Sequence, residues 1–330
     1  MTFDNSQAQV SPAQISPTST PTSEPASCTI AVVGDVHDLW DSGDETALQH
    51  LGVDLVLLVG DFGNEAVDVV RTVAQLSLPK AVILGNHDAW FTATAWGRKL
   101  RGLDPTDRVQ QQLDLLGDTH IGFGKLDFPQ FGLTVVGSRP FSWGGSTWKN
   151  RSFYQQRFGV DGFEASTAKI VAAAAGALHQ TIIFIGHCGP KGLGEQAEDP
   201  CGKDWNPIGG DYGDPDFTAA IEQTRALGKQ IPLVAFGHMH HSLRHTKTRQ
   251  RKMLDVDSNG TVYLNAASVP RIRSTPTGQV RNFSLVTLTA GVVTKAALVW
   301  IHDDLTIQSE QILYQLAGPV LASEETKLLR

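Results

Sequence analysis

Six short apolar segments, each closed by a glycine and then a polar residue, constrain the fold more than any other feature of the chain. They are rich in β-branched residues and almost continuous in hydrophobicity, which is typical of strands buried on both faces. The segments are CTIAVVGD (28–35), VDLVLLVGD (53–61), KAVILGNHD (80–88), LTVVGS (133–138), QTIIFIGH (180–187) and PLVAFGH (232–238).

Segments with helical periodicity lie between these predicted strands. EAVDVVRTVAQL (65–76) repeats its apolar residues at helical spacing, and Ser42 and Glu45 have the spacing of a capping box. Alternating strands and helices predict right-handed crossovers and a mixed or parallel sheet covered by helices, so the fold class is α/β. Further predicted helices are DRVQQQLDLLG, ASTAKIVAAAAGALH and DFTAAIEQTRALG.

The last third of the chain has a different pattern. TVYLNAAS (261–268), FSLVTLTAG (283–291) and VVTKAALVWI (292–301) are predicted strands, and they indicate a second, antiparallel sheet. QSEQILYQLAG is predicted to form a closing helix.

Composition predicts one large α/β domain over residues 28–315. Residues 1–27 are rich in Ser, Thr, Pro and Gln and lack the basic and apolar regions of a secretory signal, so we expect a disordered leader. Residues 316–330 are expected to be a C-terminal tail. With 41% hydrophobic residues, the domain can bury a sizeable core.

Charge and cysteine content narrow the class of protein. The formal net charge of −7 argues against a nucleic-acid partner, because such proteins need basic residues to neutralise phosphates. No apolar run reaches the length of a membrane span, and three cysteines are too few for a disulfide framework. We therefore expect a soluble, cytoplasmic protein and leave its oligomeric state open.

Polar residues with metal-binding side chains follow the predicted strands. Functional groups of open α/β sheets cluster beyond the carboxyl ends of the strands, and glycines there let the chain turn. Imidazole and carboxylate together favour Zn, Fe or Mn, and about eight donors suit two ions that share a bridging carboxylate. The residues are Asp35, His37, Asp61, Asn86, His87, Asp88, His187, His238 and His240.

The motifs GDVH, GD, GNHD, GH and GHMH occur in this order between residues 28 and about 268. This series resembles the calcineurin-like metallophosphoesterases. The resemblance implies a four-layer α/β/β/α sandwich of the metallo-dependent phosphatase type. One departure is Asp38, which stands where the family commonly has glycine after the first histidine.

The resemblance also implies a role for each matching residue. Asp35, His37 and His240 would hold one metal ion, Asn86, His187 and His238 would hold the second, and Asp61 would bridge the two. His87 would face the substrate and protonate the leaving oxygen or stabilise the transition state, while Asp88 would orient His87. The implied reaction is hydrolysis of a phosphomonoester, phosphodiester or pyrophosphate by attack of a metal-bridged hydroxide.

Two alternative functions remain open at this stage. One is a non-catalytic metal-binding scaffold of the same fold, which complete metal loading would argue against. The other is a nuclease of the same superfamily, for which the basic segment RHTKTRQRK (244–252) is the only support. A small phosphorylated substrate is the expected partner.

Two further regions are candidates for substrate recognition. Arg139 could bind a phosphate oxygen through its two-pronged guanidinium. The loop 189–216 is long, rich in Gly and Pro and without periodicity, so we expect a lid over the metals. His241 is expected at the rim or surface, and Cys201 is expected to have no chemical role.

Overall fold

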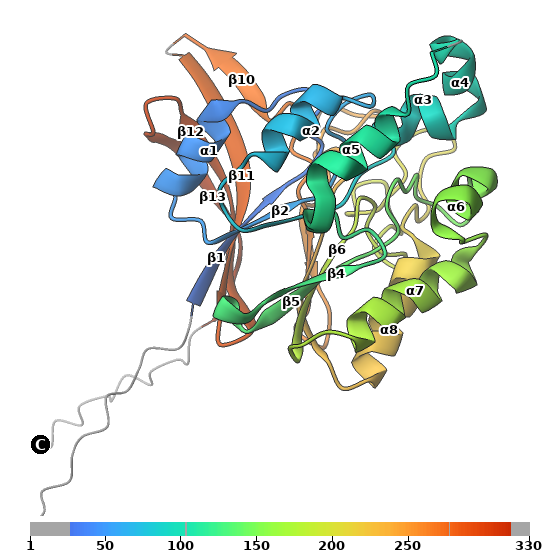
Figure 1. Ribbon diagram of the computed structural model, residues 1–330. Helices are drawn as coiled ribbons and strands as arrows, with labels where there is room; N and C mark the ends of the chain where they lie inside the picture. Colours follow the sequence, from blue (N-terminus) through green and yellow to red (C-terminus); the bar gives the residue numbers. More distant parts are fainter. Residues whose placement is uncertain (1–26, 103, 277, 318–330) are drawn as a thin grey trace, which may run out of the picture.

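The computed structural model describes residues 27–102, 104–276 and 278–317, and these form two sheets packed face to face with helices outside (Figure 1). The predicted leader lies outside the described residues except for Ser27, as does most of the predicted tail. In the described ranges, no helix has the length and apolar character needed to cross a bilayer.

The first sheet has the order β13-β12-β11-β1-β2-β3, with β10 paired to β11. β1 pairs in parallel with β2 and antiparallel with β11. Its strands are β1 (Ser27–Val33), β2 (Leu55–Leu58), β3 (Lys80–Val82), β10 (Ile272–Thr275), β11 (Gly278–Thr289), β12 (Val292–His302) and β13 (Ile307–Gln315).

The second sheet has the order β4-β5-β6-β7-β9-β8, and its four central strands are parallel. Its strands are β4 (Lys125–Phe128), β5 (Leu133–Gly137), β6 (Thr181–Ile185), β7 (Gln230–Phe236), β8 (Leu254–Val256) and β9 (Val262–Asn265).

Helices cover the outer face of each sheet (Figure 1). The helices are α1 (Ser42–His50), α2 (Val67–Ala74), α3 (Trp90–Ala93), α4 (Ala95–Arg101), α5 (Arg108–Leu116), α6 (Arg151–Phe158), α7 (Phe163–Ala175) and α8 (Pro215–Ala226). Short 3-10 turns are η1 (His87–Ala89), η2 (Gly117–Thr119) and η3 (Pro129–Phe131).

Three apolar layers hold these elements together, and the strand alternation explains them. In β1, Ile30 faces the opposite sheet while its neighbour Ala31 faces the helices, and both are fully buried. In β6, Ile183 lies between the sheets while Phe184 packs under α7 and α8. The predicted burial on both faces is confirmed, and the result is the four-layer α/β/β/α sandwich.

The division between the sheets differs from the sequence prediction. β11 and β12 do not form a separate sheet: β11 pairs with β1, on the side opposite β2, and extends the first sheet. β9 instead joins the second sheet in parallel with β7. The reason is that β1 has an open edge opposite β2, and pairing there satisfies backbone groups that a separate sheet would leave exposed.

Two local predictions were also wrong. Residues 307–315 form strand β13, not a helix, because pairing with β12 overrides the weak helical preference of this mostly exposed segment. The capping box of α1 uses Asp41 and Asp44 instead of Ser42 and Glu45. The helix therefore begins one residue earlier than the predicted caps would place it.

Candidate metal centre

The predicted ligands meet at one rim, to which both sheets contribute. Asp35 and His37 follow β1, Asp61 follows β2, and Asn86 follows β3 of the first sheet. His187 follows β6, and His238 and His240 follow β7 of the second sheet. Because the sheets pack face to face, loops that leave their strands at the same end approach each other, and two groups of candidate ligands form.

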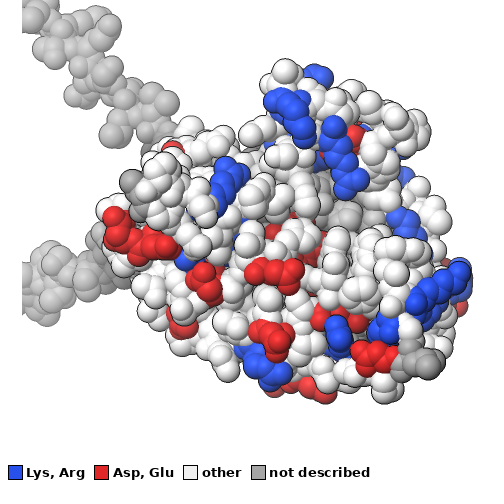
Figure 2. Space-filling view, turned by 90° about the horizontal axis from the view of Figure 1, so that it is seen from above, with Lys and Arg blue, Asp and Glu red and all other residues white. Residues whose placement is uncertain are grey.

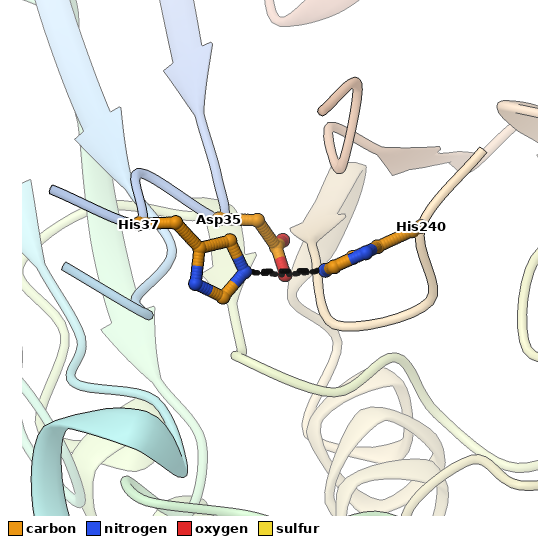
Figure 3. A group of neighbouring side chains, drawn as sticks. All are labelled: Asp35, His37 and His240. Carbon is orange, nitrogen blue, oxygen red and sulfur yellow. Dashed lines mark hydrogen bonds and ion pairs between the residues drawn. The ribbon is translucent and has the colours of Figure 1, made fainter. Parts of the chain in front are cut away.

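The first group contains Asp35, His37 and His240, whose side chains point toward one another (Figure 3). Asp35 Oδ1 lies 3.2 Å from His240 Nε2 and 3.8 Å from His37 Nε2, and the two ring nitrogens are 3.2 Å apart. Ligands that each lie about 2.1 Å from one ion are about 3.0–3.4 Å apart at octahedral or tetrahedral angles. The spacing fits a shared cation.

Asp35 provides the strongest test of that fit. Its side chain is fully buried; Oδ2 accepts a hydrogen bond from the backbone N–H of His238, but Oδ1 has no hydrogen-bond partner in the described structure. Burial opposes ionisation of Asp35, but His240 and His187 lower its pKa to about 2. A buried carboxylate oxygen without a donor is costly, and a cation would satisfy it.

The second group contains Asp61, His187 and His238, with Asn86 beside them. His187 Nε2 lies 3.3 Å from Asp61 Oδ1, 2.9 Å from Asn86 Oδ1 and 3.2 Å from His238 Nδ1. His187 Nδ1 lies 2.8 Å from the carbonyl oxygen of Val59, which only accepts, so the hydrogen is on Nδ1. Nε2 then has a free lone pair directed at the other ligand atoms, as a metal-binding histidine requires.

The backbone at the ligands is strained. Asp35, His37, Asp61 and His238 have φ values of 52°, 45°, 56° and 67°, in the left-handed region that non-glycine residues rarely adopt. Such residues cost about 1–3 kcal/mol each and cluster at functional sites. The sharp turns after the strands are thus made largely by the ligands themselves.

The neighbouring glycines provide space more than they provide turns. A Cβ atom at Gly85 would collide with Asp61 Oδ1, and one at Gly237 would collide with Asp35 Oδ2. The sequence prediction assigned these glycines to chain reversal. Their main contribution is to let two carboxylates approach the adjacent backbone closely.

His87 is held beside the two groups but its ring belongs to neither. Its Nδ1 lies 2.7 Å from Asn64 Oδ1, and its Nε2 lies 4.0 Å from Asp61 Oδ2. The side chain is 31% exposed, so a substrate can reach it. Asn64 was not identified in the sequence; its only signal is its position three residues after Asp61 in the same turn.

Asp88 does not have the predicted contact with the His87 ring. Its carboxylate accepts hydrogen bonds from the backbone N–H groups of Asp61, Phe62 and Gly85, at 2.7–3.0 Å. It therefore fixes the loops after β2 and β3 relative to each other. Among the described residues, Asn64 provides the hydrogen bond that orients the His87 ring.

Arg139 lies away from the predicted substrate position. Its guanidinium is 4% exposed and donates to Asp214 at 2.7 Å and to Asp216 at 2.8 Å, at the start of α8. It also lies 4.8 Å from the ring centroid of Trp148. A buried guanidinium needs such partners, and with its donors engaged it does not line the cavity over the metal centre.

The loop 189–216 forms part of the wall of that cavity, to which it contributes Asp204, Trp205 and Tyr212. The buried Arg251 donates to the carbonyl oxygens of three loop residues. These bonds connect the loop to the segment after β7, and a role as a lid stays a prediction. The three carbonyls belong to Ala197, Asp199 and Gly202.

The remaining candidate residues have structural roles. Within the basic segment 244–252, Arg251 is buried, while Arg249 and Lys252 pair with Glu198 and Asp199. His241 is buried, not at the surface, and bonds the carbonyl of Asn265. Cys201 is a buried free cysteine whose pKa is raised by burial, in agreement with the prediction that it is unreactive.

Solved structures similar to this chain have low sequence identity, and the superpositions are loose. A dimetal phosphatase from Danio rerio is 13% identical with a TM-score of 0.45, over 89% of this chain and 100% of that one. The protein TT1561 of Thermus thermophilus is 14% identical with a TM-score of 0.43, over 81% and 100% of the two chains. A search of curated proteins found no match.

A family model provides the decisive comparison. The model of the calcineurin-like phosphoesterases matches residues 28–242, which is more than half of the 330 residues. This range contains every candidate ligand of both groups. The chain therefore belongs to the calcineurin-like phosphoesterase family, and it is a metal-dependent phosphoric ester hydrolase.

Proposed function

We propose that the chain hydrolyses a small phosphorylated substrate at a centre of two divalent cations, with Mn, Fe and Zn as the candidates. Asp35, His37 and His240 would hold one cation; Asn86, His187 and His238 would hold the other. Asp61 would bridge them. The observation that carries the proposal is the buried Asp35 Oδ1, which has no hydrogen-bond partner among the described residues and faces two ring nitrogens.

The charge of the ligand set supports a phosphate substrate. Two carboxylates, from Asp35 and Asp61, would partly neutralise two divalent cations, and the other proposed ligands are neutral imidazoles and an amide. The centre would retain positive charge, which attracts a phosphoryl group. When bound, such a pair of cations activates water and neutralises the charge that develops on the phosphoryl oxygens.

The chain's own residues would orient the substrate and move the proton. Asn64 holds His87 through Nδ1, which leaves Nε2 facing the metal centre. Because the Asn64 oxygen only accepts, the hydrogen of the neutral ring is on Nδ1, so Nε2 would donate to the leaving oxygen from the protonated, imidazolium form of His87. Asp88 would act indirectly, since its bonds to three backbone N–H groups keep Asp61 and Asn86 in place.

A direct test is hydrolysis of p-nitrophenyl phosphate and bis(p-nitrophenyl) phosphate by the protein loaded with Mn²⁺. The pair distinguishes a monoesterase from a diesterase. Asp61→Asn should abolish activity and reduce the metal content of the purified protein, whereas Asp255→Asn, at an exposed position of β8, should change neither. Full activity in Asp61→Asn would refute the assignment, and less than one ion per wild-type chain would favour the scaffold.

A further inference from the structure

A cavity of about 560 Å³ lies directly over the candidate metal centre. Side chains of Asn86, His87, His238 and His240 line it on the side of the metal centre. Binding sites for small molecules commonly measure about 300–1,000 Å³. The cavity therefore has room for a leaving group much larger than a phosphate, and its other lining residues indicate which kind.

Two tryptophans continue from His87 along one side of the cavity. The ring of Trp90 stacks on His87 with centroids 4.9 Å apart and an interplanar angle of 16°. Trp143 stacks in turn on Trp90, at 5.2 Å and 28°. This side thus consists of a stack of rings that extends two ring spacings from the residue that would face the scissile bond, and Trp143 is the ring farthest from that residue.

Two further aromatic residues come from the loop 189–216. Trp205 and Tyr212 line the cavity and contact each other edge to face, with centroids 4.7 Å apart. Tyr212 is also nearly parallel to the ring of the metal-ligand candidate His238, with centroids 6.4 Å apart. We call Trp90, Trp143, Trp205 and Tyr212 the aromatic walls.

Arg244 adds a positive charge to the same cavity. Its guanidinium lies 5.4 Å from the ring centroid of Trp205 and forms no hydrogen bond or ion pair within the described ranges. The nearby carboxylate of Asp204 is engaged by the backbone N–H of Arg244 and by Arg251 at 3.5 Å. The donors of Arg244 are thus available to an anionic ligand.

We propose that the substrate is a mononucleotide-sized phosphoester, with its base against the aromatic walls and an oxygen of its phosphate or sugar on Arg244. This inference rests on the proposed function. In a nucleotide a sugar separates base and phosphate, which matches aromatic surface that continues outward from His87. An aryl group attached directly to the phosphate would cover only the first ring.

The surface charge favours a single nucleotide over a nucleic acid. Figure 2 views the molecule of Figure 1 from above. On this face acidic and basic side chains are interspersed, without a continuous basic stripe. A polymer would need such a stripe to track its backbone. In the basic segment 244–252, Arg249, Arg251 and Lys252 bind within the protein, while Arg244 points to the cavity.

Substrate pairs with and without a nucleoside base test this inference; in the second pair the comparison compound lacks the sugar as well. The Mn²⁺-loaded protein is compared on AMP and ribose 5-phosphate, and on p-nitrophenyl thymidine 5′-phosphate and methyl p-nitrophenyl phosphate. The base-bearing member of the active pair should have a kcat/KM about tenfold higher or more, since stacking of a base on an aromatic side chain has about that effect.

Variants in the aromatic walls should remove this preference. Trp143→Ala and Trp205→Ala should each reduce the ratio of the two kcat/KM values several-fold, and Trp205→Phe should restore most of it. Trp300→Ala is the matched control, because Trp300 lies on β12 against Arg273. Quenching of tryptophan fluorescence by AMP, and not by ribose 5-phosphate, would report binding without turnover.

The outcomes separate the two proposals. If the protein hydrolyses none of these four compounds and neither p-nitrophenyl phosphate nor bis(p-nitrophenyl) phosphate, the proposed function itself is overturned. Activity on the last two compounds alone would overturn only the nucleotide inference. Equal rates on both members of a pair, or a base preference that survives in both alanine variants, would overturn only the nucleotide inference. A strongly salt-dependent preference for single-stranded oligonucleotides over AMP would also overturn it, in favour of a nuclease.

Discussion

Replacing Arg139 tests whether this residue holds the fold or binds substrate. Its guanidinium is buried between Asp214 and Asp216, with the hydroxyl of Ser166 also bonded to Asp216. In Arg139→Met both carboxylates would remain buried without their cation. Removing one partner of a buried ion pair costs about 3–5 kcal/mol, which would lower the melting temperature by about 6–15 °C.

The assay is thermal unfolding followed by circular dichroism, together with KM on p-nitrophenyl phosphate at a temperature where the variant is folded. We expect a large loss of stability with KM unchanged. Arg139→Lys keeps the charge but loses the two-pronged contact, so its loss should be smaller. Adding Asp214→Asn and Asp216→Asn to Arg139→Met should recover stability. An unchanged melting temperature with a raised KM would show that Arg139 binds substrate.

Three further predictions concern the site and the stability of the protein. His87→Gln should lower kcat by about 10²–10⁴ for an alkyl phosphate and much less for p-nitrophenyl phosphate, whose leaving group needs no proton; equal losses would contradict a role as acid. Removing the metal with a chelator should lower the melting temperature. Adding the metal back at 100 times its dissociation constant should restore about 2.7 kcal/mol of the free energy of unfolding, and an unchanged melting temperature would argue against metal binding. Burial lowers the pKa of His120 to about 4 from an ordinary value near 6.5, so the unfolded chain binds a proton that the folded chain lacks between these values. The free energy of unfolding should therefore fall as the pH drops from 6.5 toward 4. His120→Phe should flatten this dependence on pH, as measured by urea unfolding, and an unchanged dependence would show that His120 is not its cause.

The site was largely predictable from local sequence because its geometry follows from strand ends. A strand buried on both faces must be followed by a loop at the rim, and polar residues there have few structural uses. Asp35, Asp61 and His187 each follow such a strand and come together in the structure. Periodicity likewise predicted β1, β2, β3, β5, β6 and β7 and the helices α2, α5, α7 and α8, since hydrophobic spacing reflects burial directly. It did not predict β4 or the short helices α3, α4 and α6.

What remained hidden depends on contacts between residues far apart in the chain. Asp88 is adjacent to His87, yet it binds backbone groups of the loop after β2, and Asn64 from that loop orients the histidine. Only the packing of β2 against β3 decides that Asn64, and not Asp88, contacts the His87 ring. The partners of Arg139 lie more than 70 positions away, with separations of 75 and 77 residues.

The C-terminal strands show the same limit. The sequences of β11 and β12 indicate strands but not which sheet they join, because that choice depends on the open edge of β1, more than 240 positions earlier in the chain. Local patterns therefore indicated most of the buried strand residues and the candidate ligands. Tertiary packing alone decided how the strands are shared between the sheets, which residue holds His87, and which aromatic side chains surround the metal centre.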